Sequence, residues 1–154
     1  MTQMNLHWKF KPFASLELEE LYAILKARQE VFNMEQEIHY TDPDDRDQDA
    51  WHLFAQDEEG EIVAYLRLLP PGKMTMHSVG RVITSKKYRR QGFGQELMRQ
   101  LFIKVEEQFG KIDLGMSAQL YLEDFYIGFD FKTASEPYVE EGVEHIKMIY
   151  TAQH

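Results

Sequence analysis

The residues best suited to chemistry lie in segment 88–102, which reads YRRQGFGQELMRQLF. Gly92 and Gly94 let the backbone turn tightly and approach a ligand, and a helix that starts there presents free amides to a negative oxygen atom. Arg89 and Arg90 add positive charge in a chain whose formal net charge is -9. Cations gathered at one turn of an acidic chain favour an anionic ligand, so we predict a pyrophosphate-binding turn here.

The spacing of this turn separates it from two other phosphate-binding loops. It reads Arg-x-x-Gly-x-Gly, which matches neither the GxGxxG of dinucleotide-binding folds nor the GxxxxGK[ST] of P-loop ATPases. The apolar run 79–84 precedes it, so a strand, a turn and a helix are predicted in succession. A polar connection that binds no ligand is the alternative interpretation.

The composition is that of an ordinary folded protein. With 154 residues, 44% of them hydrophobic, residues 1–154 are predicted to form a single domain with a sizeable core. The count of zero cysteines excludes a disulfide framework, a thiolate metal site and a cysteine nucleophile. The excess of 26 Asp and Glu over 17 Lys and Arg disfavours a nucleic-acid partner and suits a cationic or amine substrate.

The chain carries no pattern that directs it to a membrane. Its first residues, MTQMNLHWKFKPF, lack the apolar core of a signal peptide. No run approaches the roughly 18 apolar residues of a membrane span. We therefore expect a cytoplasmic protein without a membrane partner, which the absence of cysteine also suits.

Hydrophobic periodicity predicts an α/β domain. Apolar runs predict strands over residues 6–10, 51–56, 62–69, 79–84, 112–116, 129–132 and 145–151. Helical spacing predicts helices over about residues 16–32, 92–108 and 120–127. The strands at 51–56 and 62–69 are expected to form an antiparallel hairpin, and the strand, helix and strand around the proposed turn a parallel crossover unit.

The first predicted helix should pack one face on the sheet, with Ser15 as its cap. The expected face consists of Leu18, Leu21, Tyr22, Leu25 and Phe32. Two acidic stretches, 33–50 and 136–144, have no apolar period and are predicted to be loops.

Charged residues in and around loop 33–50 admit two interpretations. Its aspartates are Asp42, Asp44, Asp45, Asp47 and Asp49. A calcium loop is disfavoured because the central glycine and the distal glutamate are missing, so a solvated loop is the preferred interpretation. His39 and His52 lack metal-ligand spacing, and no metal site is predicted. Arg28 and Arg67 lie in apolar elements and need carboxylate partners, so we expect ion pairs that order this loop.

At this point the chain resembles the GNAT superfamily of N-acetyltransferases. The superfamily signature is a strand followed by [QR]-x-x-G-x-[GA], which is matched by Arg89, Gly92 and Gly94. A second superfamily element is matched by Gln119, Tyr126, Gly128 and Phe129. Features of the narrower ElaA-like branch are Arg28 to Phe32, Glu35 and Gln36, the acidic stretch before His52, Leu66 and Arg67, and the segment 138–148.

The resemblance implies a fold and a cosubstrate. The fold is a GNAT-like mixed, mostly antiparallel twisted sheet with a central splayed parallel strand pair and flanking helices. The implied cosubstrate is acetyl-CoA, whose acetyl group passes to a primary amine of a small molecule or peptide by direct attack. The implied contacts are Val82, Ile83 and Thr84 for the pantetheine and thioester, Gln119 for the cofactor, and Arg89, Arg90, Gln91, Gly92, Phe93, Gly94 and Gln95 for the pyrophosphate.

Acetyl transfer to an amine needs a proton acceptor and a proton donor. The amine must lose a proton before it attacks, and the departing thiolate is best protonated as it leaves. The resemblance implies Tyr126 as the general acid; for an isolated tyrosine, a core position is the alternative. His52, His145 and Glu140 are the candidates for the base, beside a water relay, since the fifth strand offers only Asp113 as an acid.

Two other functions remain open from the sequence. A non-catalytic acyl-CoA-binding module would suit the missing base. An acyl-homoserine lactone synthase would share Arg28, Phe32, Glu35, Asp42 and Asp45, although those chains are generally longer. The sequence leaves the acceptor and the oligomeric state open; a homodimer is one assembly that the resemblance implies.

Overall fold

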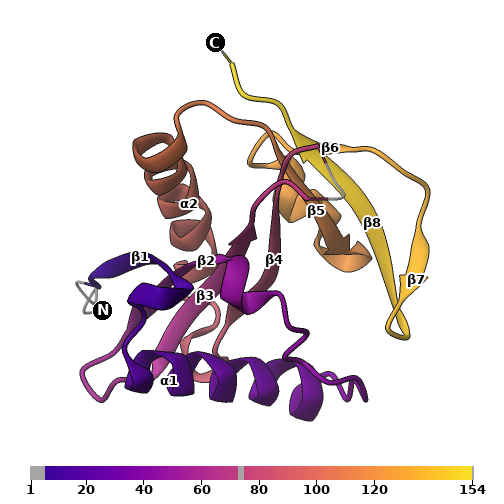
Figure 1. Cartoon of the computed structure of the whole chain (residues 1–154). Coiled ribbons are helices and arrows are strands. Elements are labelled where there is room, and N and C mark those ends of the chain that lie inside the picture. The colour runs from indigo at the N-terminus through magenta and orange to yellow at the C-terminus, as the bar shows by residue number, and fades with distance from the viewer. Residues whose placement is uncertain (1–5, 73–74, 154) are drawn as a thin grey trace.

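The computed structural model describes residues 6–72 and 75–153, which fold around one twisted sheet (Figure 1). The strand order is β1-β2-β3-β4-β5-β8-β6, with β7 paired to β8. The strands are β1 (Trp8–Pro12), β2 (Trp51–Gln56), β3 (Ile62–Leu69), β4 (His77–Thr84), β5 (Leu114–Gln119), β6 (Lys132–Thr133), β7 (Tyr138–Glu140) and β8 (Val143–Tyr150). Within the described residues β4 and β5 run parallel and the other pairs antiparallel, which confirms the predicted fold class.

Helices cover both faces of the sheet. The helices are α1 (Leu18–Arg28), α2 (Phe93–Phe109) and α3 (Glu123–Ile127). Because side chains alternate along a strand, Leu53 and Leu66 join α2 in one buried cluster, whereas Phe54 and Tyr65 join α1 in another. Figure 1 shows α1 and α2 on opposite sides of β2 and β3. None of the helices in the described ranges has the length and apolar character needed to cross a membrane.

The buried face of α1 differs from the predicted one. Leu18 and Tyr22 are 87% and 74% exposed, while the sheet is covered by a face that includes Ile24 and Ala27. The prediction failed because the buried face also carries the charged residues Glu20 and Arg28, which periodicity analysis assigns to solvent.

The N-terminus of α1 is also capped differently from the prediction. Ser15 lies in a separate 3-10 turn, Phe13–Ser15. Instead, the Glu17 N–H donates to Glu20 Oε1 at 2.9 Å, one half of a capping box. Two lysines, Lys9 and Lys11, lie 2.8 and 2.9 Å from the same Glu20 carboxylate, which fixes the helix start against β1.

The C-terminus of α1 continues without a break into a π-helix, Gln29–Glu35. The helical segment therefore ends beyond the predicted residue 32. π-helical turns are rare and frequently lie at functional sites. The acidic stretch that follows is a loop with one 3-10 turn, Asp47–Asp49.

A bulge in β4 opens the centre of the sheet. The pairing of β3 with β4 shifts between Tyr65 and Arg67, and Arg81 at the bulge has a left-handed φ of 52°. Parallel pairing with β5 extends only as far as Val79 and Met116. The two strands therefore separate after this point, which creates the splay that the resemblance implied.

The elements after β4 follow the prediction with shifts at their ends. Gly92 (φ 85°) is the N-cap of α2 and Gly110 (φ 80°) its C-cap. β5 begins at Leu114, so Asp113 lies outside the strand and its Oδ1 accepts the Ala152 N–H at 2.8 Å. That contact fixes the chain just after β8. Asp113 therefore does not occupy the position on the fifth strand at which a general base was sought.

The C-terminal region contains more strand than the prediction allowed. The stretch 136–144, predicted to be a loop, contains β7 and its turn into β8 at Glu141 and Gly142, both with positive φ. The predicted strand 129–132 is reduced to β6, because the amides of residues 129–131 donate to the carbonyls of Tyr126 and Ile127 in the turn that ends α3. The β7–β8 hairpin extends past β5 and forms one wall of the site.

Candidate active site

A cleft of about 380 Å³ lies where β4 and β5 separate. Its walls come from Gly80 to Val82 on β4 and from Ser117 to Gln119 on β5. Its other lining residues include Gln36 after the π-helix, Tyr126 on α3, and Glu140 and His145 on the β7–β8 hairpin. The splay therefore brings strand backbone, a tyrosine, a histidine and a carboxylate into one cleft.

A second hollow of about 300 Å³ lies at the start of α2. It contains most of the residues predicted to hold a pyrophosphate, together with two aromatic side chains. The lining residues are Thr84, Tyr88, Arg89, Arg90, Gly92, Phe93, Gly94, Gln95 and Phe125. Gln91 is outside this set, and its amide donates to the Lys87 carbonyl at 3.2 Å.

The backbone at this hollow fits an anionic group. The first α2 amide with an intrahelical acceptor is that of Glu96, which donates to Gly92 at 3.0 Å. Amides before it in the first turn have no intrahelical acceptor and can donate to an anion. A Cβ on Gly94 would lie 3.6 Å from Thr84 Oγ1 and 3.8 Å from Phe125, so it would fill the space beside these amides. The residues present thus suit a pyrophosphate.

Each of the three guanidinium nitrogens of Arg89 donates to a protein oxygen. Its Nη1 and Nη2 donate to the two carboxylate oxygens of Glu35 at 2.6 and 2.9 Å, and its Nε donates to the Thr84 carbonyl at 3.1 Å. Arg90 is exposed, with a left-handed φ of 63°. The positive charge of the turn is thus partly neutralised by a carboxylate from the π-helix.

Gln119, predicted to contact the cofactor, forms a reciprocal pair of amide hydrogen bonds. Its Nε2 donates to Gln36 Oε1 at 2.9 Å, and the Nε2 of Gln36 donates back at 3.3 Å. Both side chains line the cleft. An amide group has two donors and two lone pairs, so each retains capacity for a further hydrogen bond.

Tyr126 lines the cleft and is 3% exposed. Its ring packs edge-to-face against Phe125 and Phe131, with centroid distances of 5.2 and 6.0 Å. Burial raises the pKa of the phenol, because the phenolate would lose its hydration. The hydroxyl therefore stays protonated at neutral pH and is able to donate a proton.

The two predicted histidines have different environments. The His145 ring lines the cleft; its Nδ1 donates to the Val143 carbonyl at 2.7 Å, and its Nε2 lies 3.8 Å from Glu140 Oε2. His52 is fully buried, with Nε2 donating to the Asp47 carbonyl at 3.0 Å and Nδ1 2.7 Å from the Tyr65 hydroxyl. Burial lowers the pKa of His52, so it is a neutral core residue that does not line the cleft.

Sequence reasoning missed Ser117, a residue of β5 that lines the cleft and contacts the β7–β8 hairpin. Its Oγ donates to Glu140 Oε2 at 2.7 Å and also contacts the Tyr138 hydroxyl. A polar residue within the apolar β5 run was the available signal.

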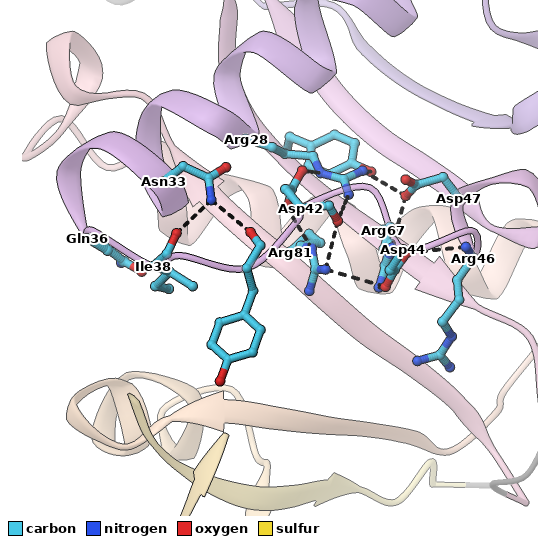
Figure 2. A network of polar contacts seen from close by, with 12 residues as sticks. Arg28, Asn33, Gln36, Ile38, Asp42, Asp44, Arg46, Asp47, Arg67 and Arg81 are labelled. Carbon is cyan, nitrogen blue, oxygen red and sulfur yellow. Dashed lines mark hydrogen bonds and ion pairs between the residues drawn. The ribbon is translucent and has the colours of Figure 1, made fainter. Parts of the chain in front are cut away.

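The expected ion pairs of Arg28 and Arg67 are present (Figure 2). Arg28 binds Asp42 and Asp47 at 2.8 and 2.7 Å. Arg67 binds Asp47 at 3.0 Å and Asp44 at 2.6 Å. Asp42 and Asp47 are buried, so ion pairs hold this part of the loop against the sheet, and it is not the solvated loop that the sequence favoured.

Arg81, a third arginine that was not predicted to take part, completes the network. It lies 2.9 Å from Asp42 and 3.4 Å from Asp44, which ties the acidic loop to the β4 bulge. A charge between the apolar residues Val79 and Val82 was the sequence signal for it. No group of three or more histidine, aspartate or glutamate side chains suited to a metal ion occurs in the described residues.

Comparisons with known proteins agree with this geometry. Residues 18–152 match the family model described as an acetyltransferase (GNAT) domain. A UPF0039 protein of Synechocystis is 37% identical over 148 residues, which cover 96% of each chain. An acyl-CoA N-acyltransferase of Pseudomonas aeruginosa is 37% identical, with a TM-score of 0.89 over 96% of this chain and 100% of that one.

The protein ElaA of Escherichia coli has a similar structure. It is 32% identical, with a TM-score of 0.86 over 94% of this chain and 99% of its own. Its likeness and that of the UPF0039 protein extend over almost the whole chain. The chain therefore belongs to the GNAT acetyltransferase family, together with ElaA and the UPF0039 proteins.

Proposed function

We propose that this protein is a cytoplasmic acetyl-CoA-dependent N-acetyltransferase, that residues 1–154 form its single domain, and that its acceptor is a primary amine of a small molecule or peptide. One observation carries the proposal: a glycine turn suited to pyrophosphate adjoins a splayed cleft that is lined by a buried tyrosine. Membership in the GNAT family and the likeness to an acyl-CoA N-acyltransferase support it.

The proposed cofactor contacts follow the course of β4 into α2. Main-chain groups of Val82, Ile83 and Thr84 would hold the pantetheine arm and thioester carbonyl, and Gln119 would contact the arm from β5. The pyrophosphate would be held by the turn, with Arg89, Arg90, Gln91, Gly92, Phe93, Gly94 and Gln95 as its proposed residues. Acetyl-CoA would supply an activated acyl group as a thioester.

Tyr126 is proposed as the general acid. Its phenol is protonated at neutral pH and would donate that proton to the departing thiolate. Its packing against Phe125 and Phe131 restrains the ring, so that the hydroxyl has a defined direction.

His145 is proposed as the base that accepts the amine proton. Because its Nδ1 donates to the Val143 carbonyl, the neutral ring has its lone pair on Nε2, toward Glu140. The Glu140 carboxylate also lines the cleft and would attract a cationic amine. His52 is left out of this mechanism because both of its nitrogens have partners in the core.

Two measurements test this function in sequence. Isothermal titration with acetyl-CoA and with CoA should show saturable binding that an Arg90→Glu, Gly92→Asp double variant loses. Thiol release with a panel of amines should then identify an acceptor. Absence of binding at millimolar acetyl-CoA would refute the acetyltransferase assignment.

The variant Tyr126→Phe tests the chemistry separately from binding. We expect kcat to fall by about 10² to 10⁴, the usual contribution of a general acid, with CoA affinity retained because the ring stays in place. An unchanged kcat would remove Tyr126 from the mechanism. Binding of acetyl-CoA without turnover on any amine would instead favour a non-catalytic acyl-CoA-binding module.

A further inference from the structure

Two consecutive residues at the end of the π-helix bind both walls of the cofactor site. Glu35 holds Arg89 at the α2 turn through two hydrogen bonds of 2.6 and 2.9 Å. Gln36 holds Gln119 on β5 through hydrogen bonds of 2.9 and 3.3 Å. Both partners are among the residues proposed to contact the cofactor, so the segment lies at the boundary between the turn and the cleft.

The backbone fixes this segment in place. The Gln36 N–H donates to the Val31 carbonyl at 3.0 Å, the wide spacing of a π-helix. The side-chain amide of Asn33 donates to the carbonyls of Ile38 at 2.8 Å and Tyr40 at 3.0 Å (Figure 2). Because both ends of the segment are restrained, the Glu35 carboxylate is held close to the turn.

The charge of Glu35 opposes the ligand that the turn suits. Arg89 keeps its position through its Nε bond to the Thr84 carbonyl, so Glu35 is not needed to orient it. The carboxylate does neutralise the guanidinium, and this weakens the attraction between the turn and an anion.

We propose that Glu35 is an affinity- and specificity-determining residue for the cofactor, resting on the function proposed above. It acts through the charge of Arg89, which it partly neutralises, and is not itself a cofactor ligand. Glu35 lowers the affinity for ligands that carry the CoA phosphates and leaves the affinity for the pantetheine arm alone unchanged. The CoA product carries the same phosphates as acetyl-CoA, so the same contact weakens retention of the product.

The test is titration calorimetry with CoA and with pantetheine, which lacks the pyrophosphate. Glu35→Gln removes the charge with little change in shape, and Glu35→Ala is a second variant with the same charge change. Glu37→Gln is the matched control, because Glu37 is exposed and lies two residues further along the same segment. Thermal melts establish that each variant is folded.

We expect Glu35→Gln to bind CoA about two- to fivefold more tightly than the wild type, as loss of one partly exposed ion pair implies. Pantetheine affinity should stay constant, and Glu37→Gln should change CoA affinity less. The gain should shrink at high salt and disappear in an Arg89→Gln background, because the effect passes through Arg89.

The outcomes separate this inference from the proposed function. Weaker CoA binding by both Glu35 variants, a gain no larger than that of Glu37→Gln, or a gain that persists without Arg89 would overturn the inference alone. If the wild-type protein binds no CoA, both the proposed function and this inference are refuted.

Discussion

Asp47 offers the most direct test of how the acidic loop is held. Its Oδ1 accepts hydrogen bonds from Arg28 Nη1 at 2.7 Å and from Arg67 Nη1 at 3.0 Å. Arg28 is fully buried, and Asp47 and Arg67 are 6% and 3% exposed. The substitution Asp47→Asn keeps the side-chain shape and removes the one carboxylate that the two guanidinium groups share.

The expected loss of stability follows from this burial. Removing one partner of a buried ion pair costs about 3 to 5 kcal/mol, because the other charge stays buried. Arg28 keeps Asp42 and Arg67 keeps Asp44, which places the expected loss near 3 kcal/mol. For a chain of this size that corresponds to a decrease in Tm of about 6 to 12 °C.

Urea unfolding at pH 7, followed by circular dichroism, measures this loss. The matched control is Asp49→Asn, an exposed residue in the same 3-10 turn, which should change the free energy of unfolding by less than about 0.5 kcal/mol. If Asp47→Asn were as stable as the control, the shared carboxylate would contribute nothing and the reasoning would be refuted.

The pH dependence provides a second check on the same pair. Burial alone would raise the pKa of Asp47, but hydrogen bonds and charge from Arg28 and Arg67 lower it overall. A lowered carboxyl pKa contributes stability above the ordinary value of about 4, and this stability is lost as pH falls through the folded-state pKa. The difference between wild type and Asp47→Asn should therefore narrow below about pH 4.

Two further predictions concern the cap of each long helix. Gly92→Ala should lower the free energy of unfolding by about 1 to 2 kcal/mol, because an alanine is strained at a φ of 85°. Gly72→Ala is the control, since a Cβ at Gly72 would meet no atom within 4 Å, and it should not lower stability. Thermal melts of the two variants compare them. For Glu20, burial raises the pKa, but hydrogen bonds from the Glu17 amide and two lysines lower it from 4.5 to about 2. Between pH 6 and 3 the wild type should therefore lose about 2 kcal/mol more stability than Glu20→Gln in urea melts; equal losses would contradict the assignment.

The sequence predicted local structure and ion pairs correctly where the chemistry of single residues governs them. Gly92 takes the left-handed conformation that the glycine turn required, and α2 follows it directly. The ion pairs of Arg28 and Arg67 were predicted because a buried guanidinium needs a partner wherever the chain folds. These inferences depend on properties of single residues and their neighbours.

The failures share a different physical origin. The face of α1 was wrong because Glu20 and Arg28 are buried with partners from other elements, Lys9 and Asp42 among them. The β4 bulge at Arg81 depends on pairing with β3 and on the acidic loop, so no local pattern indicated it.

The sequence by itself determined the order of most elements and the glycine turn before α2, because strand period, helix period and glycine conformation are local properties. Its Arg89, Gly92 and Gly94 motif carried the GNAT resemblance. Only the tertiary structure decided that Glu35 binds Arg89 and that Gln36 binds Gln119. The members of the first pair are 54 positions apart in the sequence, and those of the second pair are 83 positions apart. It also separated His145 in the cleft from His52 in the core. Such contacts depend on how the sheet splays and how α1 packs across it, and these arise from the sum of many distant interactions.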